Sequence, residues 1–181
     1  MLQITTERTE FFNEDTNEFV YVQPQKLILE HSLLSVSKWE AKWKKPFLTK
    51  DDKTPEELLD YIRCMTINQN VNPLVYNCLT RNQLKAVENY IGDKASATVI
   101  RTANTPHGSG RAVTSELIYY WMTAQNIPFE CEKWHLNRLL TLIKVANIEN
   151  NPKKKKMGRR DIYNQNRALN AARRARHNTK G

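Results

Sequence analysis

The longest apolar and aromatic stretch of the chain runs from residue 114 to residue 148, TSELIYYWMTAQNIPFECEKWHLNRLLTLIKVANI, in a sequence that is otherwise polar. Thr114 suits the N-cap of a helix, whereas Pro128 disfavours helix at the preceding residue and suits the first position of a new helix. Two helices joined by a short break are expected to pack as an antiparallel hairpin. Because burying a large apolar side chain contributes roughly 1.5–3 kcal/mol, this helical hairpin is predicted to carry most of the core.

Apolar residues recur at helical spacing in both halves of this stretch. In the first half, the predicted buried face holds Leu117, Tyr120, Trp121 and Ala124, widened by Ile118 and Met122. In the second half, it holds Leu136, Leu139, Leu140, Ile143 and Ala146, with Trp134 beside it.

The N-terminal region is predicted to add a small β element. Residues 1–18 are polar and acid-bearing, and we expect them to be weakly ordered at the start. Residues 19–22 and 26–30 are strand-like runs on either side of Pro24. Such runs around a proline-containing loop indicate a β-hairpin over about residues 19–30. It needs an element to pack on, because an isolated hairpin is marginal in water.

Short helices are predicted between these two parts of the chain. Ser37 with Glu40 is a capping-box pattern, and so is Thr80 with Gln83. The strongest helix start is residues 54–57, Thr-Pro-Glu-Glu. The remaining signals are a short helix after Asn72-Pro73, a helix end at Gly92, a short strand over 95–101 and a loop over 102–110.

Trp39 and Trp43 are four residues apart, so both face one side of the helix predicted near residues 37–45. One interpretation is a nucleic-acid surface built from these aromatic rings and the neighbouring lysines. The other is a pair of core tryptophans with solvated lysines along the rim. The second is favoured, because tryptophans at helical spacing most often anchor a core.

The positive charge of the chain is concentrated at its C-terminal end. Of the 28 Lys and Arg residues, 11 lie in residues 153–181 beside one acid, Asp161, which gives this segment a net charge of +10. The other 152 residues hold 17 basic and 18 acidic residues and are nearly neutral. We therefore expect a mainly α (α+β) domain over residues 1–152 and a basic, disordered tail over 153–181, with a frayed helix at 160–176 as the less favoured alternative.

Two kinds of partner fit this tail. Its cations could contact phosphates, with steep salt dependence, or attract an acidic protein segment, and charge alone does not separate the two. The basic residues proposed for either role are Lys153, Lys154, Lys155, Lys156, Arg159, Arg160, Arg167, Arg173, Arg174 and Arg176.

No catalytic or metal-binding pattern stands out, and we expect no enzyme, no cofactor and no metal. Cys131 and His135 are four residues apart but lack the further ligands that a metal site needs. Ser109 does not sit in a nucleophile elbow, which requires G-x-S-x-G between a strand and a helix. The three cysteines, Cys64, Cys78 and Cys131, are expected to be free thiols in a reducing cytoplasm. No signal peptide or transmembrane segment is expected.

Four segments resemble small proteins of long-tailed bacteriophages, specifically the tail assembly chaperones. They are LEHSLLSVSKWEAKWKKPFL (29–48), DYIRCMT (60–66), SELIYYWMTAQNIPFECEKWHLNRLLTLIKVAN (115–147) and RALNAARRARHNTKG (167–181), and together they cover close to half of the chain. None of them is a catalytic signature.

The resemblance implies a non-enzymatic protein of the bacterial host cytoplasm that is absent from the finished virion. Such chaperones bind the helical tape-measure protein, keep it soluble and assist the assembly of tail-tube subunits around it. Self-association is left open. Because a tape-measure chain exposes long apolar stripes, apolar and aromatic groups on the chaperone suit its binding. The residues we predict for this surface are Trp39, Trp43, Trp121, Phe129 and Trp134. A virion or accessory protein that binds nucleic acid through the tail is the alternative.

Overall fold

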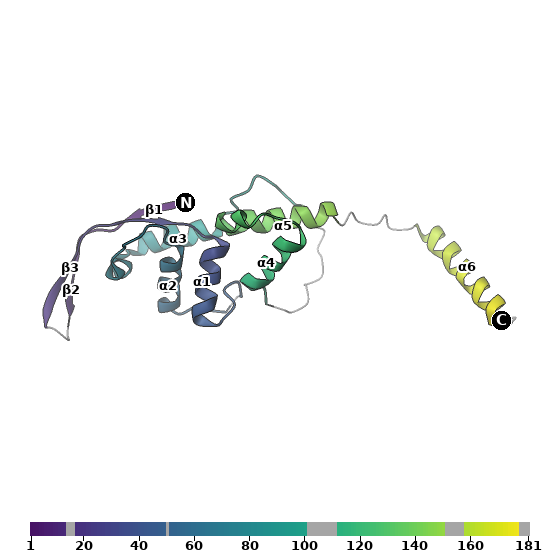
Figure 1. Cartoon of the computed structure of the whole chain (residues 1–181), viewed down its shortest axis with the longest axis horizontal. Helices are drawn as coiled ribbons and strands as arrows, with labels where there is room; N and C mark the ends of the chain where they lie inside the picture. The colour runs from purple at the N-terminus through teal and green to yellow at the C-terminus, as the bar shows by residue number, and fades with distance from the viewer. Residues whose placement is uncertain (14–16, 50, 101–111, 151–157, 178–181) are drawn as a thin grey trace. The chain divides into compact units, whose positions relative to one another are not determined.

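The computed structural model describes residues 1–13, 17–49, 51–100, 112–150 and 158–177. It contains two compact units, Met1–Asn147 and Ile148–Gly181. Within the described residues, helices predominate and the strands form small antiparallel pairs (Figure 1). The predicted mainly α (α+β) fold is confirmed.

The described residues form four short strands, six α-helices and two 3₁₀ helices. The strands are β1 (Leu2–Thr5), β2 (Thr9–Asn13), β3 (Glu18–Val22) and β4 (Lys26–Leu29). The α-helices are α1 (Leu33–Trp43), α2 (Pro55–Met65), α3 (Arg81–Gly92), α4 (Ser115–Ala124), α5 (Leu136–Asn150) and α6 (Arg159–His177). The 3₁₀ helices are η1 (Pro73–Cys78) and η2 (Phe129–Lys133).

The predicted β-hairpin over residues 19–30 is wrong, although both of its strands exist. β3 pairs with β2 and β4 pairs with β1, each pair antiparallel. The chain therefore runs out along β1 and β2 and returns along β3 and β4 (Figure 1). Pairing β1 with β4 buries Ile4, Leu27 and Leu29, whereas a turn at residues 23–25 would leave the apolar residues of β1 without a partner.

α1 begins earlier than the Ser37–Glu40 pattern predicts. Its N-cap is Ser32, whose hydroxyl accepts the Ser35 backbone N–H at 3.2 Å, while the Ser35 hydroxyl accepts the Ser32 N–H at 2.9 Å. A serine at the third helical position thus closes the capping box in place of the usual Glu or Gln. Glu40 is engaged elsewhere, as described below.

α2 begins at the predicted position. The Thr54 hydroxyl accepts the Glu57 N–H at 3.2 Å, and the Glu57 carboxylate accepts the Thr54 N–H at 2.8 Å. We expect Thr54→Ala to lower the free energy of unfolding by about 1 kcal/mol, measured by urea denaturation. Thr98→Ala removes an exposed threonine outside the helices and should change it by less than about 0.5 kcal/mol. Equal effects of the two substitutions would contradict the capping role.

The predicted helix starts at Thr80 and after Asn72 are also confirmed, as α3 and η1. The predicted strand over 95–101 is wrong, because the described part, residues 95–100, contains no strand. The predicted loop over 102–110 lies outside the described residues.

The apolar stretch at 114–148 forms two helices, α4 and α5, with η2 between them. Pro128 precedes η2, and α5 begins only at Leu136. α4 packs more extensively against α1 than against α5. The core of this unit therefore combines residues from its N-terminal and its C-terminal helices. The buried face of α4 is formed by Ile118 and Met122, while Tyr120 is 66% exposed. The predicted face is therefore correct for Ile118 and Met122 and wrong for Tyr120.

Glu40 joins α1 to the start of α4 from a buried position. One carboxylate oxygen accepts the Phe47 N–H and the other accepts the Ser115 N–H, each at 2.7 Å. The Thr114 side chain makes no capping hydrogen bond. A first-turn N–H of α4 is therefore satisfied by a carboxylate 75 residues away in sequence.

Candidate functional site

The tryptophan pair of α1 belongs to the interior of the first unit. Trp39 is 1% exposed, and its indole N–H donates to the Glu57 carbonyl at 2.9 Å. Trp43 is half-buried, stacks on Trp39 with ring centroids 6.1 Å apart, and donates to Asp60 at 2.8 Å. The core interpretation is confirmed for Trp39, which offers no surface to a partner.

Two of the lysines beside this pair, Lys42 and Lys45, are engaged by carboxylates. Lys42 lies 2.6 Å from Asp60, and Lys45 lies 2.6 Å from Glu57. The hydrogen bond from Lys45, aided by the Thr54 N–H, holds the pKa of Glu57 below its usual value. Because the Lys42 and Lys45 ammonium groups are already paired with carboxylates, the structure argues against a nucleic-acid surface around Trp39 and Trp43.

The other three predicted aromatic residues lie around η2. Trp121 and Trp134 are half-buried, and the Arg138 guanidinium lies 4.3 Å from the centroid of a Trp134 ring. Phe129 is 57% exposed, with its ring centroid 6.2 Å from that of Tyr119. Of the five aromatic residues predicted from sequence, Phe129 is the one that clearly presents a ring to solvent.

A second exposed aromatic surface lies on the β2–β3 pair. Phe12, Phe19 and Tyr21 are 51%, 58% and 56% exposed. The register places Phe12 opposite Phe19 and Glu10 opposite Tyr21. Since cross-strand partners share a face and residues two apart do too, the three rings lie on one face, which we call the aromatic face. The Phe12 and Phe19 rings meet edge to face at 5.2 Å.

Sequence reasoning missed this surface. Residues 1–18 were expected to be polar and weakly ordered at the start, and the strand at 19–22 was expected to pair with the run at 26–30. The signal is the pair of phenylalanines at 11–12, which precedes an acidic segment and the run FVYV at 19–22. Two aromatic runs around such a segment are typical of a hairpin.

Two histidines meet in the core of the first unit. The rings of His31 and His135 are 5.1 Å apart, and His31 Nδ1 hydrogen-bonds to the Tyr61 hydroxyl at 2.5 Å. Burial, and then repulsion from His135, lower the pKa of His31 to about 4. His135 uses Nε2 toward the Tyr90 carbonyl at 2.9 Å and Nδ1 toward the Asn137 N–H at 3.3 Å. Its ring is therefore committed to the backbone, and Cys131 and His135 do not act as a ligand pair.

A hollow of about 380 Å³ lies on the first unit next to His135. Glu30, Tyr90 and Arg138 contribute its polar lining. The Tyr90 hydroxyl donates to Glu30 at 2.6 Å, and burial followed by this bond raises the pKa of Tyr90. The Arg138 guanidinium stacks on Trp134, as described above. Tyr90 and Glu30 are therefore paired with each other, and the lining contains no serine or cysteine that could act as a nucleophile.

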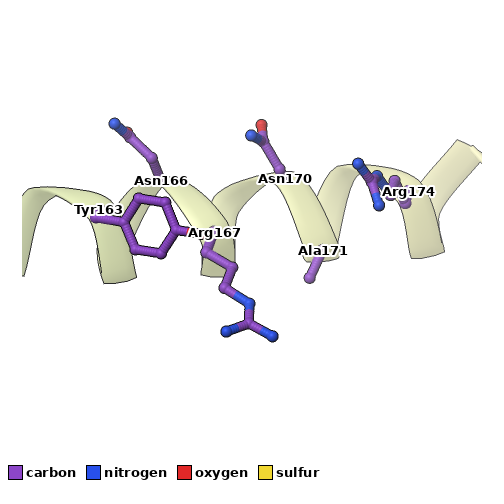
Figure 2. A pocket seen from close by; sticks show the side chains of 6 residues that line it. All are labelled: Tyr163, Asn166, Arg167, Asn170, Ala171 and Arg174. Atoms are coloured by element: carbon purple, nitrogen blue, oxygen red, sulfur yellow. The ribbon is translucent and has the colours of Figure 1, made fainter. Parts of the chain in front are cut away.

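The basic tail is helical over Arg159–His177, where α6 forms. The predicted disorder of this segment is thus wrong, and the less favoured helix at 160–176 is correct. Four alanines and six arginines, both strong helix formers, explain the helix. Its side chains from Tyr163 onward are exposed, and Figure 2 shows several of them along its length. Lys153, Lys154, Lys155 and Lys156 lie outside the described residues.

Among the helices that the structure describes, none is both long enough and apolar enough to cross a lipid bilayer. Comparisons of the chain with protein-family models, with curated proteins and with solved structures find no match.

Proposed function

We propose that this chain is a non-enzymatic tail assembly chaperone of a long-tailed bacteriophage. It binds the tape-measure protein, keeps it soluble in the host cytoplasm, assists tail-tube assembly around it, and is absent from the finished virion. The resemblance of residues 29–48, 60–66, 115–147 and 167–181 to such chaperones supports this function. The structural observation that carries the proposal is the aromatic face of the β2–β3 pair.

The aromatic face suits an apolar helical stripe. Buried aromatic side chains cover about 150–250 Å² each, and aromatic residues dominate the energetics of many interfaces. Phe12 and Phe19 are in contact before any partner arrives, so little side-chain freedom is lost when a helix covers them. Glu10 lies on the same face, opposite Tyr21, and supplies a polar edge to it.

The double substitution Phe12→Ser/Phe19→Ser tests this surface. Each lost ring removes about 1.5–3 kcal/mol of burial, so we expect the affinity for a soluble helical fragment of the tape-measure protein to fall by at least about 100-fold. Isothermal titration calorimetry measures the affinity. Because both side chains are more than half exposed, the melting temperature should stay nearly unchanged.

Ile67→Ser is the matched control, since Ile67 is 52% exposed but lies outside the β2–β3 pair. It should leave the affinity within about twofold, a change below roughly 0.5 kcal/mol. Phe129→Ser distinguishes the two aromatic surfaces. A loss with Phe129→Ser and none with the double substitution would move the binding surface to η2. Unchanged binding by all three variants would reject an aromatic binding surface at either place.

A further inference from the structure

The basic residues of α6 are of a type that suits phosphate binding. The helix carries six arginines and one acid, Asp161, and it contains no lysine. A guanidinium group offers a planar fork that matches two phosphate oxygens, whereas an ammonium group acts as a compact point charge. Described arginine side chains of α6, such as Arg167 and Arg174, are exposed.

The small residues of α6 gather on one side. Four alanines, Ala168, Ala171, Ala172 and Ala175, follow the i, i+3, i+4, i+7 spacing. At about 3.6 residues per turn they share a single face, which we call the alanine face. Small side chains let the backbone of a helix approach a partner closely.

Arginines border the alanine face on both sides. Arg160, Arg167 and Arg174 are spaced by seven residues and form one row. Arg176 lies at the opposite border, about 90° from the middle of the alanine face, whereas Arg173 lies about 150° from it. Figure 2 shows Arg167 and Ala171 on one side of the helix, with Asn166 and Asn170 on the other.

We propose that α6 binds double-stranded DNA by lying in its major groove, with the alanine face toward the bases, the row of Arg160, Arg167 and Arg174 toward the phosphates of one strand, and Arg176 toward those of the other. The major groove of B-DNA is about 12 Å wide and admits an α-helix. At about 1.5 Å per residue, the 19 residues of α6 extend about 28 Å. Alanine methyls suit contact with thymine methyls.

This arrangement of residues favours DNA over other anionic partners. An acidic polypeptide needs only the positive charge and makes no use of a small-residue face bordered by arginines. The major groove of A-form RNA is deep and narrow, so side chains cannot read it. The inference does not rest on the chaperone function, because it concerns only the second unit.

The test uses the full chain and a fluorescent 20-base-pair DNA duplex, with anisotropy measured across a salt series. In the variant Arg160→Gln/Arg167→Gln/Arg174→Gln we expect affinity to fall at least about 30-fold, and the slope of log K against log salt to shrink by about 2.7, since each phosphate contact contributes about 0.9. Glutamine is nearly as good a helix former as arginine, and circular dichroism checks the helix. The charge-matched control Lys154→Gln/Lys155→Gln/Lys156→Gln should weaken binding less than about fivefold.

A second variant tests the groove itself. Ala168→Gln/Ala172→Gln keeps every charge but fills the alanine face, and we expect binding at least about 10-fold weaker with an unchanged salt slope. Equal losses for the arginine and lysine variants would overturn the proposal. So would unchanged binding by the alanine variant, or binding of an RNA duplex or of polyglutamate as tight as that of DNA.

Discussion

Replacing Glu40 by alanine is expected to destabilise the first unit by about 3–5 kcal/mol, since each buried N–H left without an acceptor costs roughly 1–3 kcal/mol and hydrogen bonds to a charged group are the stronger kind. Glu40 is 7% exposed, and its two oxygens accept the Phe47 and Ser115 N–H groups. Chemical denaturation followed by circular dichroism measures the loss.

Two further variants make this prediction specific. Glu40→Gln keeps one acceptor oxygen and should cost about half as much as Glu40→Ala. Glu88→Ala removes an exposed glutamate from α3 and should change the free energy of unfolding by less than about 0.5 kcal/mol. A loss for Glu40→Ala no larger than that for Glu88→Ala would show that the carboxylate does not hold the start of α4.

The second large effect is a dependence of stability on pH that arises from His31. Its pKa is about 4 in the folded protein, against an ordinary value of 6.5. Between these values the unfolded chain binds a proton that the folded protein does not, so the free energy of unfolding rises with pH across this window. The stabilisation is complete above pH 6.5 and is lost as the pH falls toward 4. The difference corresponds to about 3 kcal/mol.

Urea denaturation at intervals from pH 4 to pH 7 measures this effect. Tyr61, Phe47 and His135 surround the His31 ring, so a proton on His31 meets a second imidazole and two aromatic rings. His31→Gln should flatten most of the slope, although it also lowers stability at pH 7. His177→Gln, which changes an exposed histidine of α6, should leave the slope intact. Equal slopes in the two variants would assign the pH dependence to other groups.

Features decided within a few residues were predictable from the sequence. The capping boxes at Thr54 and Thr80 each depend on a partner three residues away. The tryptophan at position 39 was expected in the core for its helical spacing, and it is there. These local signals concern α1, α2 and α3, and with the helical spacing of apolar residues in 114–148 they indicate a mainly helical fold.

Features decided by distant partners were not predictable. β3 pairs with β2 rather than with β4, although β4 follows β3 after only a few residues. The Glu40 carboxylate accepts the Phe47 and Ser115 N–H groups. The Ser37–Glu40 pattern therefore does not mark the start of a helix, although its spacing fits one. The side of α4 that is buried is set by packing against α1, so Ile118 and Met122 displace Tyr120 from the core.

The candidate binding surfaces also depend on contacts that the sequence alone does not reveal. Of the aromatic residues proposed for partner binding, Phe129 is exposed and Trp39 is not, because composition does not tell which side of a helix faces inward. The aromatic face of β2–β3 depends on a strand register that brings Phe12 opposite Phe19. The arginine row of α6, Arg160, Arg167 and Arg174, becomes visible only once the segment is known to be helical.

The soluble yield of the tape-measure protein tests the central proposal most directly. It should be expressed in bacteria alone, with this chain, and with the Phe12→Ser/Phe19→Ser variant, and the soluble fraction quantified after centrifugation. The chaperone function predicts a clear rise in soluble tape-measure protein with the unaltered chain, its co-purification with that chain, and little rise with the variant. A soluble fraction that the unaltered chain leaves unchanged, with no co-purification, would contradict it.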